Sequence, residues 1–393
     1  MEELLFQYNP WWESETFLQD VRPRDRYVER LIADLSERRA VLLIGLRRVG
    51  KSTIMRLLAE NRIRAGIPPR SILYVSLDDY LLRSSDILKI VTAFRQIHKH
   101  PVDRPLVLLL DEVTAKPDSH QQLKTLIDRE AMTVVAGSSS SSLLKDQGAY
   151  LTGRSTTLEV QPLTFEEYLQ FKDIRVARKD QQLLDSYFRD YVREGGLPEH
   201  VLHPSRDYLM NLVDDIIQKD ITAFHGLKDH QVLRDYFTLL MERSGKQVSI
   251  NKLGKILNLS ADTARRYLGY FADTYLVHLV PRHGTTNERI LSPKIVYACD
   301  LGVKHLFIGD RDWGSYFENY VYLRIRAHQP VSYVRNGTNE LDFITGDGTL
   351  IEAKYNSELE GSQKEVFDSY PAKRKRVISS VRETAQIDDM WET

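Results

Sequence analysis

Cysteine is almost missing from this sequence, which contains only Cys299 among its 393 residues. A single cysteine excludes an intrachain disulfide and any zinc site that needs several cysteines of one chain, and it suits a reducing cytosol. Long apolar runs are also missing, since none approaches the roughly 20 residues of a membrane-spanning helix. The first residues lack the basic and then apolar order of a signal peptide. We therefore expect a cytoplasmic protein with no membrane contact.

A strong excess of one charge is lacking as well, because the formal net charge is -1 at pH 7. Any binding of nucleic acid must then depend on local basic patches rather than on overall charge. The sequence shows no internal repeat, and its length exceeds what one hydrophobic core usually serves. We expect several domains of ordinary globular composition.

The most informative segment runs from Val41 to Thr53. Its first four residues are apolar and predict a buried strand, and Gly45–Ser52 then matches the phosphate loop G-x-x-x-x-G-K-[ST] at every fixed position. Apolar residues at helical spacing follow from Ile54 and predict a helix. The alternative is a glycine-containing turn that binds nothing. The order of strand, loop and helix favours a nucleotide site.

Each fixed position of this loop has a chemical role. Gly45 and Gly50 allow the backbone to turn its N–H groups toward a phosphate, at the positive N-terminus of the new helix. Lys51 would contact the β- and γ-phosphates of ATP, and the Ser52 hydroxyl would hold Mg²⁺. The other residues expected to contact the nucleotide are Arg48 and Thr53.

Two acidic residues follow a second buried strand. Leu106–Leu110 is a continuous apolar run that ends in Asp111 and Glu112. A buried parallel strand has this pattern, and ligands collect at the carboxyl ends of such strands. Asp111 would support the Mg²⁺ shell, and Glu112 would polarise the attacking water. The acidic pair is weak evidence alone, but after a matched phosphate loop it predicts an ATPase site.

Two further strands carry additional candidates. Thr133–Ala136 leads into the serine run Ser138–Ser142, in which Ser138 could sense the γ-phosphate or the water. The remaining serines fit a flexible loop almost as well. Arg154 precedes the predicted strand Thr156–Val160 and could neutralise transition-state charge in its own subunit or in a neighbouring one. A plain surface arginine is an equally good interpretation of Arg154.

These motifs together resemble the prokaryotic AAA-type ATPases that carry a C-terminal domain of unknown function with a nuclease-like fold. The segments that carry the resemblance span almost the whole chain: Gly45–Thr53, Leu106–Glu112, Ala136–Ser140, Leu151–Arg154, Pro162–Tyr168 and Gly195–Pro198. The resemblance implies nucleotide binding by Lys51 and Ser52 and metal binding by Asp111. It also implies that Glu112 is the base and Ser138 the sensor.

The middle of the chain turns helical after a polar linker around residues 171–182. Within Ser249–Leu268, two short helical patterns are joined by a brief turn, and Ser260 is the expected N-cap of the second. This arrangement is typical of a helix-turn-helix, and Leu276–Val280 could add a wing strand. The residues that would face a DNA groove are Thr263, Arg265, Arg266 and Tyr267. The alternative is a helical hairpin that only packs against the ATPase domain.

The final segment predicts a β-hairpin that brings two carboxylates together. If the turn is centred on Asp347, Asp342 lies opposite Glu352, and Glu340 lies opposite Lys354. Two carboxylates side by side are unfavourable unless a cation lies between them. A hard divalent ion such as Mg²⁺, with Mn²⁺ as an alternative, is therefore expected, and Lys354 would orient or activate water.

Glu318 strengthens this hypothesis. On a predicted helix it shares a face with apolar residues, where a carboxylate is costly without a partner. Together with Asp342, Glu352 and Lys354 it resembles the PD-(D/E)xK nuclease superfamily, which includes Holliday-junction resolvases and restriction endonucleases. The resemblance implies a metal site of Glu318, Asp342 and Glu352, with Lys354 as a catalytic residue. The alternative is an ordinary ion pair between Glu340 and Lys354, without a working metal site.

We therefore predict an α/β P-loop AAA-type ATPase core, a helical and winged-helix middle domain, and a C-terminal α/β restriction-endonuclease-like domain. The expected boundaries are residues 1–170 for the core, 171–240 for a helical lid or linker region, 241–285 for the winged-helix-like domain and 286–393 for the nuclease-like domain.

The first functional hypothesis is a DNA-processing ATPase that uses ATP and Mg²⁺ and cleaves DNA, with branched DNA such as a Holliday junction as a candidate substrate. A second is a nucleotide-dependent switch in signalling or defence, whose C-terminal domain only binds a partner. A third is a DNA-remodelling ATPase that cuts nothing. We expect a homo-oligomer, such as the rings that AAA-type relatives form.

Overall fold

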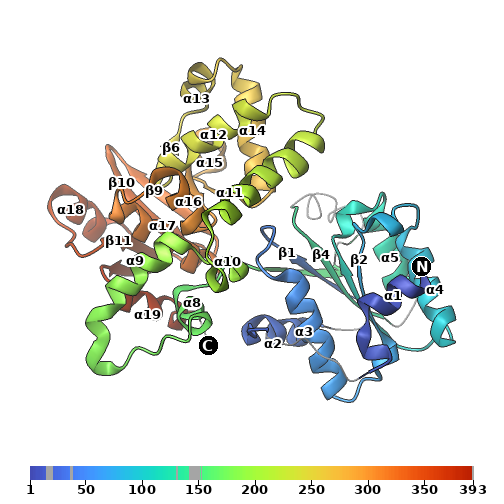
Figure 1. Ribbon diagram of the computed structural model, residues 1–393. Coiled ribbons are helices and arrows are strands. Elements are labelled where there is room, and N and C mark those ends of the chain that lie inside the picture. The colour runs from blue at the N-terminus through green and yellow to red at the C-terminus, as the bar shows by residue number, and fades with distance from the viewer. Residues whose placement is uncertain (15–20, 36–38, 130–131, 141–150, 152, 392–393) are drawn as a thin grey trace. The chain divides into compact units, whose positions relative to one another are not determined.

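The computed structural model describes residues 1–14, 21–35, 39–129, 132–140, 151 and 153–391. They form two compact units, Met1–Gln161 and Pro162–Thr393 (Figure 1). Ser141 and Ser142 of the predicted serine run lie outside the described residues. Across the described ranges, each helix is too short or too polar to cross a membrane.

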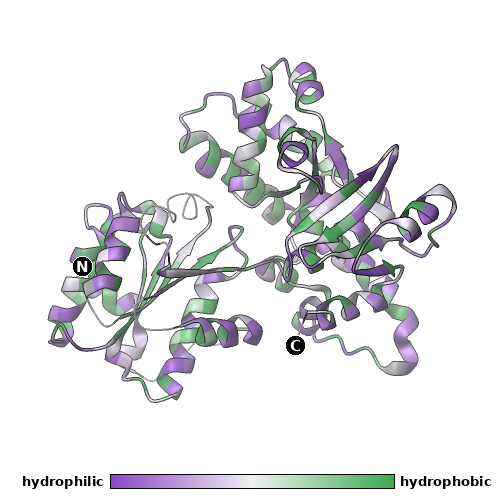
Figure 2. Cartoon of the chain, turned by 180° about the vertical axis from the view of Figure 1, so that it is seen from behind, coloured by the Kyte–Doolittle hydropathy of each residue, from purple (hydrophilic) through white to green (hydrophobic). Residues whose placement is uncertain are grey.

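A parallel sheet forms the centre of the first unit. Its strands, which lie in the order β2-β3-β4-β1-β5, are β1 (Ala40–Ile44), β2 (Ile72–Ser76), β3 (Leu106–Asp111), β4 (Met132–Ser138) and β5 (Ser155–Glu159). Every neighbouring pair is parallel. Hydrophobic residues concentrate along these strands (Figure 2), because both faces of the sheet are covered. The strands predicted at the positions of β1, β3, β4 and β5 are confirmed, with small differences at their ends.

Helices cover both faces of this sheet. One face is covered by α3 (Lys51–Arg64) with α2 (Asp25–Asp34), and the other by α4 (Ile87–His98) and α5 (Ser119–Arg129) (Figure 1). The N-terminal helix α1 (Glu2–Tyr8) leads to Asn9, whose side chain pairs with the edge strand β2. Its amide donates to the Tyr74 carbonyl at 2.9 Å and accepts from the Tyr74 N–H at 2.6 Å. The N–H and the carbonyl of Tyr74 on this edge strand thereby have hydrogen-bond partners.

The second unit begins with helices and a small antiparallel sheet. The helices are α8 (Phe165–Phe171), α9 (Leu184–Glu194), α10 (Pro198–Leu202), α11 (Arg206–Asp215), a π-helical turn (Ile216–Ala223) and α12 (His230–Glu242). The sheet has the order β6-β8-β7 and consists of β6 (Lys246–Val248), β7 (Val277–Val280) and β8 (Lys294–Ala298). A short helix, α15 (Thr286–Leu291), lies between β7 and β8.

The predicted helix-turn-helix is present as α13 (Ile250–Ile256) and α14 (Ala261–Asp273), which connect β6 to β7. Ser260 caps α14, because its hydroxyl accepts from the Thr263 N–H at 3.1 Å. Arg265 and Arg266 are exposed, as expected. Tyr267 is not, since its side chain is buried against Tyr236, and the expectation that it faces DNA is corrected.

A four-stranded sheet completes the second unit in the order β12-β11-β10-β9. Its strands are β9 (Val331–Asn336), β10 (Asn339–Thr345), β11 (Thr349–Ala353) and β12 (Arg374–Ile378). The associated helices are α16 (Leu301–Ile308), α17 (Trp313–Arg326), α18 (Gly361–Ser369) and α19 (Ala385–Asp389). The pair β11 and β12 is parallel, whereas the other two pairs are antiparallel.

One hydrophobic core joins both sheets of the second unit to its helices. It includes Phe165 of α8, Tyr297 of β8 and Phe317 of α17. The helix α8 therefore belongs to the second unit, although the expected core domain extended to residue 170. The strand β8 pairs with β6 and β7, so the expected boundary at residue 285 divides a sheet. Both differences arise from contacts between residues far apart in the sequence, which local patterns do not report.

Candidate functional sites

The phosphate-loop motif connects β1 to α3. Gly45 has φ +138°, and a Cβ atom there would lie 2.2 Å from the carbonyl oxygen of Val160. Gly50 has φ +98°, which L-residues with a side chain rarely adopt. The helix α3 begins at Lys51, so the unsatisfied N–H groups of its first turn follow the loop directly. The motif therefore has the backbone that a phosphate requires.

Predicted ligands of the nucleotide and its metal come together at the carboxyl ends of the strands. The Ser52 hydroxyl of α3 donates to Asp111 Oδ2 of β3 at 2.5 Å. Tyr74 donates to the same oxygen at 3.1 Å. Lys51 Nζ donates to two carbonyl oxygens of the loop, each at 2.9 Å. Because Mg²⁺ prefers hard oxygen ligands, Ser52 and Asp111 fit the metal that accompanies ATP.

Glu112 follows Asp111 in a left-handed backbone conformation, with φ +48°. Its Oε2 accepts from the N–H and the hydroxyl of Ser139 at 3.2 and 3.0 Å. Burial raises the pKa of the Glu112 carboxyl, and the charge of Lys51 opposes this rise. A carboxylate with a pKa shifted toward neutrality is suited to act as a general base. Ser139 cannot be told from its serine neighbours in the sequence, and only the fold identifies it.

Ser138 ends β4, the strand between β1 and β3. It thus lies at the carboxyl ends of the strands, as Asp111 does. Its hydroxyl lies 3.0 Å from the Thr114 hydroxyl. The preceding Gly137 is tightly enclosed, because a Cβ atom there would lie 2.5 Å from Met55 Cε and 2.7 Å from Asp111 Oδ1. The fold therefore requires glycine beside the acidic strand.

The other predicted residues of this unit are Arg48, Thr53 and Arg154. Arg48 is exposed in the loop, and Thr53 is half-buried in the first turn of α3. Arg154 precedes β5, whose first residue pairs with the first residue of β1, whereas the phosphate loop follows the last residue of β1. Its guanidinium pairs with Asp128 at 2.5 Å. Arg154 thus lies at the end of the strands opposite to the phosphate loop. This position corrects the expected role at the nucleotide of its own subunit. A role in a neighbouring subunit stays a prediction.

The C-terminal hairpin has the predicted register. Phe343 pairs with Ile351, so Asp342 lies opposite Glu352. The Asp342 N–H donates to Glu352 Oε2 at 3.1 Å, and Asp342 Oδ2 accepts from the Ala353 N–H at 2.9 Å. The fold therefore brings these two carboxylates side by side.

Glu352 is fully buried, and its other carboxylate oxygen also has partners. Oε1 accepts from Lys354 Nζ at 3.1 Å and from Gln363 Nε2 at 2.5 Å. Burial raises the pKa of Glu352, and Lys354 opposes the rise. The Glu340 carboxylate instead accepts from the amide of Gln247 at 2.5 Å. The alternative of an ion pair between Glu340 and Lys354 is therefore wrong.

Glu318 comes from α17. Its Oε1 accepts from the Tyr297 hydroxyl at 2.6 Å, and burial raises the pKa of Glu318 to about 7. Burial also raises the pKa of Asp342, and the charges of Glu318 and Glu352 add to that rise. The charge of Lys304, a fully buried lysine of α16, partly offsets the effect at Glu318. The charges of Glu318 and Glu352 therefore disfavour the ionised form of Asp342, and the charge of Glu352 also disfavours that of Glu318.

The described part of the chain contains no group of three or more His, Cys, Asp or Glu side chains arranged to hold a metal ion. The predicted set of Glu318, Asp342 and Glu352 stays a prediction as one metal site. The charge of Glu352 raises the pKa of Glu318, and the charge of Glu318 raises the pKa of Asp342, whereas Gln363 of α18 contacts Glu352. Asp342 and Glu352 are the pair that the hairpin brings together.

The parallel sheet, the phosphate loop and the acidic strand define the first unit as an ATPase-like P-loop core. Residues 37–169 match the family model of an AAA domain. Residues 185–313 match a family described as a domain of unknown function (DUF8612). Both matched ranges end before residues 314–393, which contain Glu318 and the hairpin carboxylates.

Similar proteins occur in distant organisms. An uncharacterized protein of Methanocaldococcus jannaschii is 24% identical over 349 residues, which cover 82% of this chain and 76% of that protein. An uncharacterized protein of Haemophilus influenzae is 23% identical over 337 residues, covering 82% of this chain and 83% of that protein. Among solved structures, the replication initiator DnaA bound to AMPPCP and single-stranded DNA has a TM-score of 0.30 at 14% identity, covering 68% of this chain and 92% of that chain. Both sequence matches are longer than either compact unit and therefore include parts of both.

Proposed function

We propose that this protein is a DNA-processing ATPase. The observation that carries ATP hydrolysis is the contact between Ser52 and Asp111, which joins the phosphate loop to the acidic strand. Lys51 would bind the phosphates of ATP, while Ser52 and Asp111 would hold Mg²⁺. Bound Mg²⁺ would offset the negative charge of the phosphates. Glu112 would accept the proton of the attacking water.

The test of this site compares Lys51→Ala with Arg64→Ala. Lys51 is buried in the loop, whereas Arg64 is exposed at the other end of the same helix and pairs with Glu60. We expect Lys51→Ala to abolish ATP binding and hydrolysis, and Arg64→Ala to retain both. A wild-type protein that does not hydrolyse ATP, with or without DNA, would contradict the proposal.

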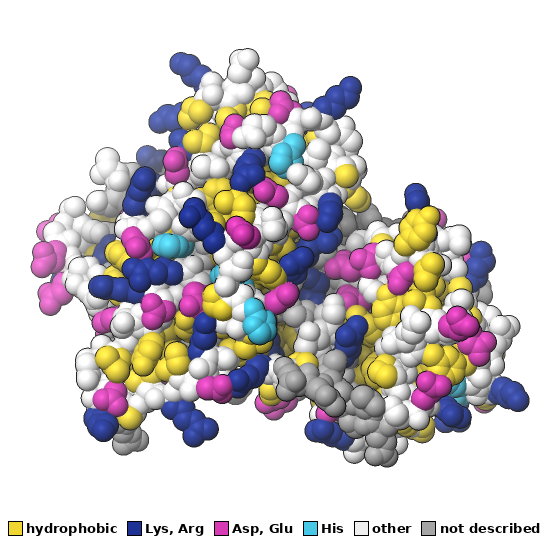
Figure 3. Space-filling model, in the orientation of Figure 1, with side chains coloured by type: hydrophobic (Ala, Val, Ile, Leu, Met, Phe, Trp, Pro, Cys, Tyr) yellow, Lys and Arg dark blue, Asp and Glu magenta, His cyan; other side chains and the backbone are white. Residues whose placement is uncertain are grey.

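DNA binding is proposed for the segment from α12 to β8. Its element order is helix, strand, helix, helix, strand, short helix, strand, with an antiparallel sheet in the order β6-β8-β7, and this supports a winged helix. Lys and Arg side chains project from the surface over α13 and α14 (Figure 3). The exposed basic residues of these helices are Lys252, Lys255, Arg265 and Arg266. Such residues would contact phosphates, so binding should weaken as salt increases.

DNA cleavage is proposed for the hairpin carboxylates. The observation that carries it is the buried pair of Asp342 and Glu352, with Lys354 3.1 Å from Glu352. Burial and mutual repulsion make this pair unfavourable in its ionised form, and a cation would remove that cost. The element order α17, β9, β10, β11, α18, β12 adds support for the resemblance to PD-(D/E)xK nucleases.

The residues fit a hard divalent ion, since Asp342 and Glu352 offer adjacent carboxylate oxygens. They would hold Mg²⁺ or Mn²⁺, which when bound would lower the pKa of a water molecule. Lys354 would orient that water through its ammonium group. In the reaction, the water would lose one proton as its oxygen bonds to phosphorus, the phosphodiester P–O bond would break, and the leaving oxygen would take up one proton, so that protons balance.

A second candidate is a DNA-remodelling ATPase that does not cut. It is favoured by the hydrogen bonds of Glu352, because protein donors occupy both of its oxygens: Lys354 and Gln363 on one, and the Asp342 N–H on the other. In that case the C-terminal sheet binds DNA or a partner, and ATP hydrolysis alone changes the complex.

Cleavage of end-labelled single-stranded, duplex and four-way-junction DNA, with Mg²⁺ or Mn²⁺ and with or without ATP, separates the two candidates. The matched variants are Glu352→Gln at the buried carboxylate and Glu358→Gln at an exposed one nearby. We expect metal-dependent cutting that Glu352→Gln reduces at least about 100-fold and Glu358→Gln leaves unchanged. A wild type that hydrolyses ATP and binds DNA but cuts none of these substrates would favour the non-cleaving ATPase.

A further inference from the structure

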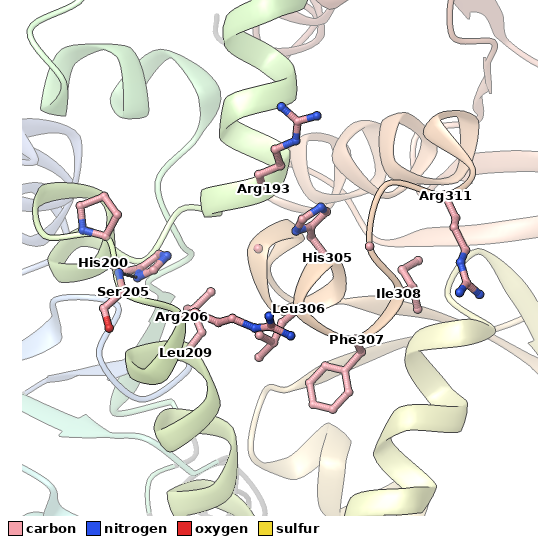
Figure 4. Close-up of a pocket in the computed structure, with 13 residues that line it drawn as sticks. Arg193, His200, Ser205, Arg206, Leu209, His305, Leu306, Phe307, Ile308 and Arg311 are labelled. Atoms are coloured by element: carbon pink, nitrogen blue, oxygen red, sulfur yellow. Dashed lines mark hydrogen bonds between the residues drawn. The ribbon is translucent and has the colours of Figure 1, made fainter.

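The second unit contains an open cavity that neither proposed activity uses. Its volume is about 630 Å³, within the range of roughly 300–1,000 Å³ found for small-molecule sites. It lies among α9, α10, α11 and α16, and Figure 4 shows the residues that line it. Five of these residues carry a guanidinium or an imidazole: Arg193, Arg206, Arg311, His200 and His305. No Asp or Glu is among the described residues that line it.

Buried contacts form the wall of this cavity. At Gly302 of α16, a Cβ atom would lie 2.4 Å from the Glu194 carbonyl oxygen, so only glycine allows the ends of α9 and α16 to approach. The buried Asp300 caps α16 and also accepts from the Gly196 N–H at 2.6 Å. The glycine pair of the sequence motif at residues 195–198 therefore serves this junction. A cavity with such walls is formed before any ligand binds.

Two of the three arginines have no counter-charge in the described residues. Arg193 donates to the carboxylate of Asp310 at 3.1 and 3.2 Å. Arg206 and Arg311, by contrast, are exposed and make no side-chain hydrogen bond or ion pair within the described ranges. In Figure 4 they lie on either side of Leu306, Phe307 and Ile308. Two positive charges therefore flank an apolar surface.

The two histidines supply further polar groups. His200 Nδ1 accepts from the Ser205 N–H at 3.2 Å, so in the neutral ring the proton is on Nε2, which can donate. Burial lowers the pKa of His200 and favours this neutral form. His305 lies 3.3 Å from Asp310, which already binds Arg193. Asp310 thus balances the Arg193 side of the cavity, and the excess positive charge is on Arg206 and Arg311.

We propose that this cavity binds a small aromatic phosphate ester of the nucleoside monophosphate type. The phosphate would pair with the guanidinium of Arg206 or of Arg311, because guanidinium groups match phosphate oxygens in geometry and charge. The aromatic ring would pack against Leu306 and Phe307, which are half-buried and leave part of their surface open. The proposal does not depend on ATP hydrolysis or DNA cleavage, since it uses residues of neither site.

Equilibrium dialysis of the full chain tests this proposal. Lys51→Ala removes the expected nucleotide binding at the phosphate loop, and the ligands are AMP, GMP, CMP and UMP, with adenosine and inorganic phosphate for comparison. We expect at least one monophosphate to bind at least about tenfold more tightly than either adenosine or phosphate. Arg206→Ala or Arg311→Ala should weaken it about tenfold or more, and so should the double variant, whereas Arg265→Ala, at an exposed arginine of α14, should not.

Several outcomes would overturn the proposal. The proposal fails if none of the four monophosphates binds, if inorganic phosphate binds equally well, or if the double variant of Arg206 and Arg311 binds the monophosphate as before. Both side chains are exposed, so the variants should remain folded, and circular dichroism with thermal unfolding verifies this. If a single-stranded oligonucleotide binds through the same arginines and displaces the monophosphate at lower concentration, the cavity belongs to a DNA path, and the small-ligand proposal fails.

Discussion

The phosphate loop and the hairpin carboxylates both place buried acids beside a lysine, but they are built differently. At the phosphate loop, Ser52 of the helix α3 and Asp111 of the strand β3 already contact each other at 2.5 Å. At the hairpin, Asp342 and Glu352 are adjacent on paired strands, while Glu318 comes from the helix α17. The first contact pairs a hydroxyl with a carboxylate. The second set gathers like charges, which repel one another until a cation joins them.

The largest expected effect concerns the base of the first site. Glu112→Gln keeps the shape of the side chain and removes its ability to accept a proton, so ATP hydrolysis should fall about 100-fold or more while ATP binding is retained. Glu29→Gln, at an exposed carboxylate of α2, is the control. Steady-state hydrolysis and nucleotide binding measure the two effects. If Glu112→Gln hydrolyses ATP at the wild-type rate, another group is the base.

Gly137→Ala tests whether packing sets the geometry of the first site. The new methyl group would lie 2.5 Å from Met55 Cε and 2.7 Å from Asp111 Oδ1, so it must displace one of them. We expect ATP hydrolysis to fall about tenfold or more and the free energy of unfolding to decrease by about 1–3 kcal/mol. Gly269→Ala, in an open position of α14, should instead stabilise the protein slightly. Urea unfolding and ATPase assays measure these effects. If the two variants behave alike, packing around Gly137 does not set the geometry of the site.

The carboxylate cluster should show its repulsion as a pH dependence. Burial raises the pKa of Glu318 from 4.5 to about 7. A raised carboxyl pKa destabilises the folded state only when the group ionises, so the cost is absent below about pH 4.5, grows between pH 4.5 and 7, and is complete above pH 7. Its upper limit is about 3.5 kcal/mol, from about 1.4 kcal/mol per pKa unit.

Glu318→Gln should therefore stabilise the protein at pH 8 relative to wild type and have little effect at pH 4.5. Chemical unfolding at both pH values in the presence of EDTA measures this, with Glu358→Gln as the exposed control. Adding Mg²⁺ at pH 8 should stabilise the wild type more than Asp342→Asn, if the carboxylates bind the ion. An identical pH dependence of stability in wild type and Glu318→Gln would show that ionisation of Glu318 does not destabilise the folded state.

The smallest expected change in stability is at Arg154. Its ion pair with Asp128 joins side chains that are 41% and 36% exposed, and such pairs contribute about 0–1 kcal/mol. Arg154→Ala should therefore unfold almost as the wild type does. If Arg154 acts in a neighbouring subunit, the variant loses ATP hydrolysis, and mixing it with Lys51→Ala restores part of the activity. If Arg154→Ala by itself hydrolyses ATP at the wild-type rate, Arg154 is a surface arginine with no role in hydrolysis.

Local patterns predicted much of this molecule correctly. Four apolar residues before Gly45 are sufficient for β1, and the alternating residues around Asp347 set the hairpin register, because side chains of a strand alternate between its faces. The N-cap of α14 at Ser260 also follows from residues close in the sequence. These features depend on a few consecutive residues, and the chain forms them wherever the segment lies.

Features that depend on distant residues were not predictable in this way. Ser139 binds Glu112, Gln363 binds Glu352, and Tyr297 binds Glu318, yet none of these partners has a distinctive sequence pattern. Tyr267 was expected at the surface but is buried. Helical spacing reports which residues share a face, but it does not report what covers that face.

The sequence by itself determined the phosphate loop, its parallel strands and the hairpin with Asp342 opposite Glu352, because each follows from backbone preferences and side-chain spacing over short segments. The tertiary structure alone decided that Arg154 lies at the end of the strands opposite to the phosphate loop and that Tyr297 is a partner of Glu318. It also decided that Arg206 and Arg311 line one cavity. The physical reason is that packing brings distant segments together to bury apolar surface, and the positions of charged groups on those segments follow from that packing.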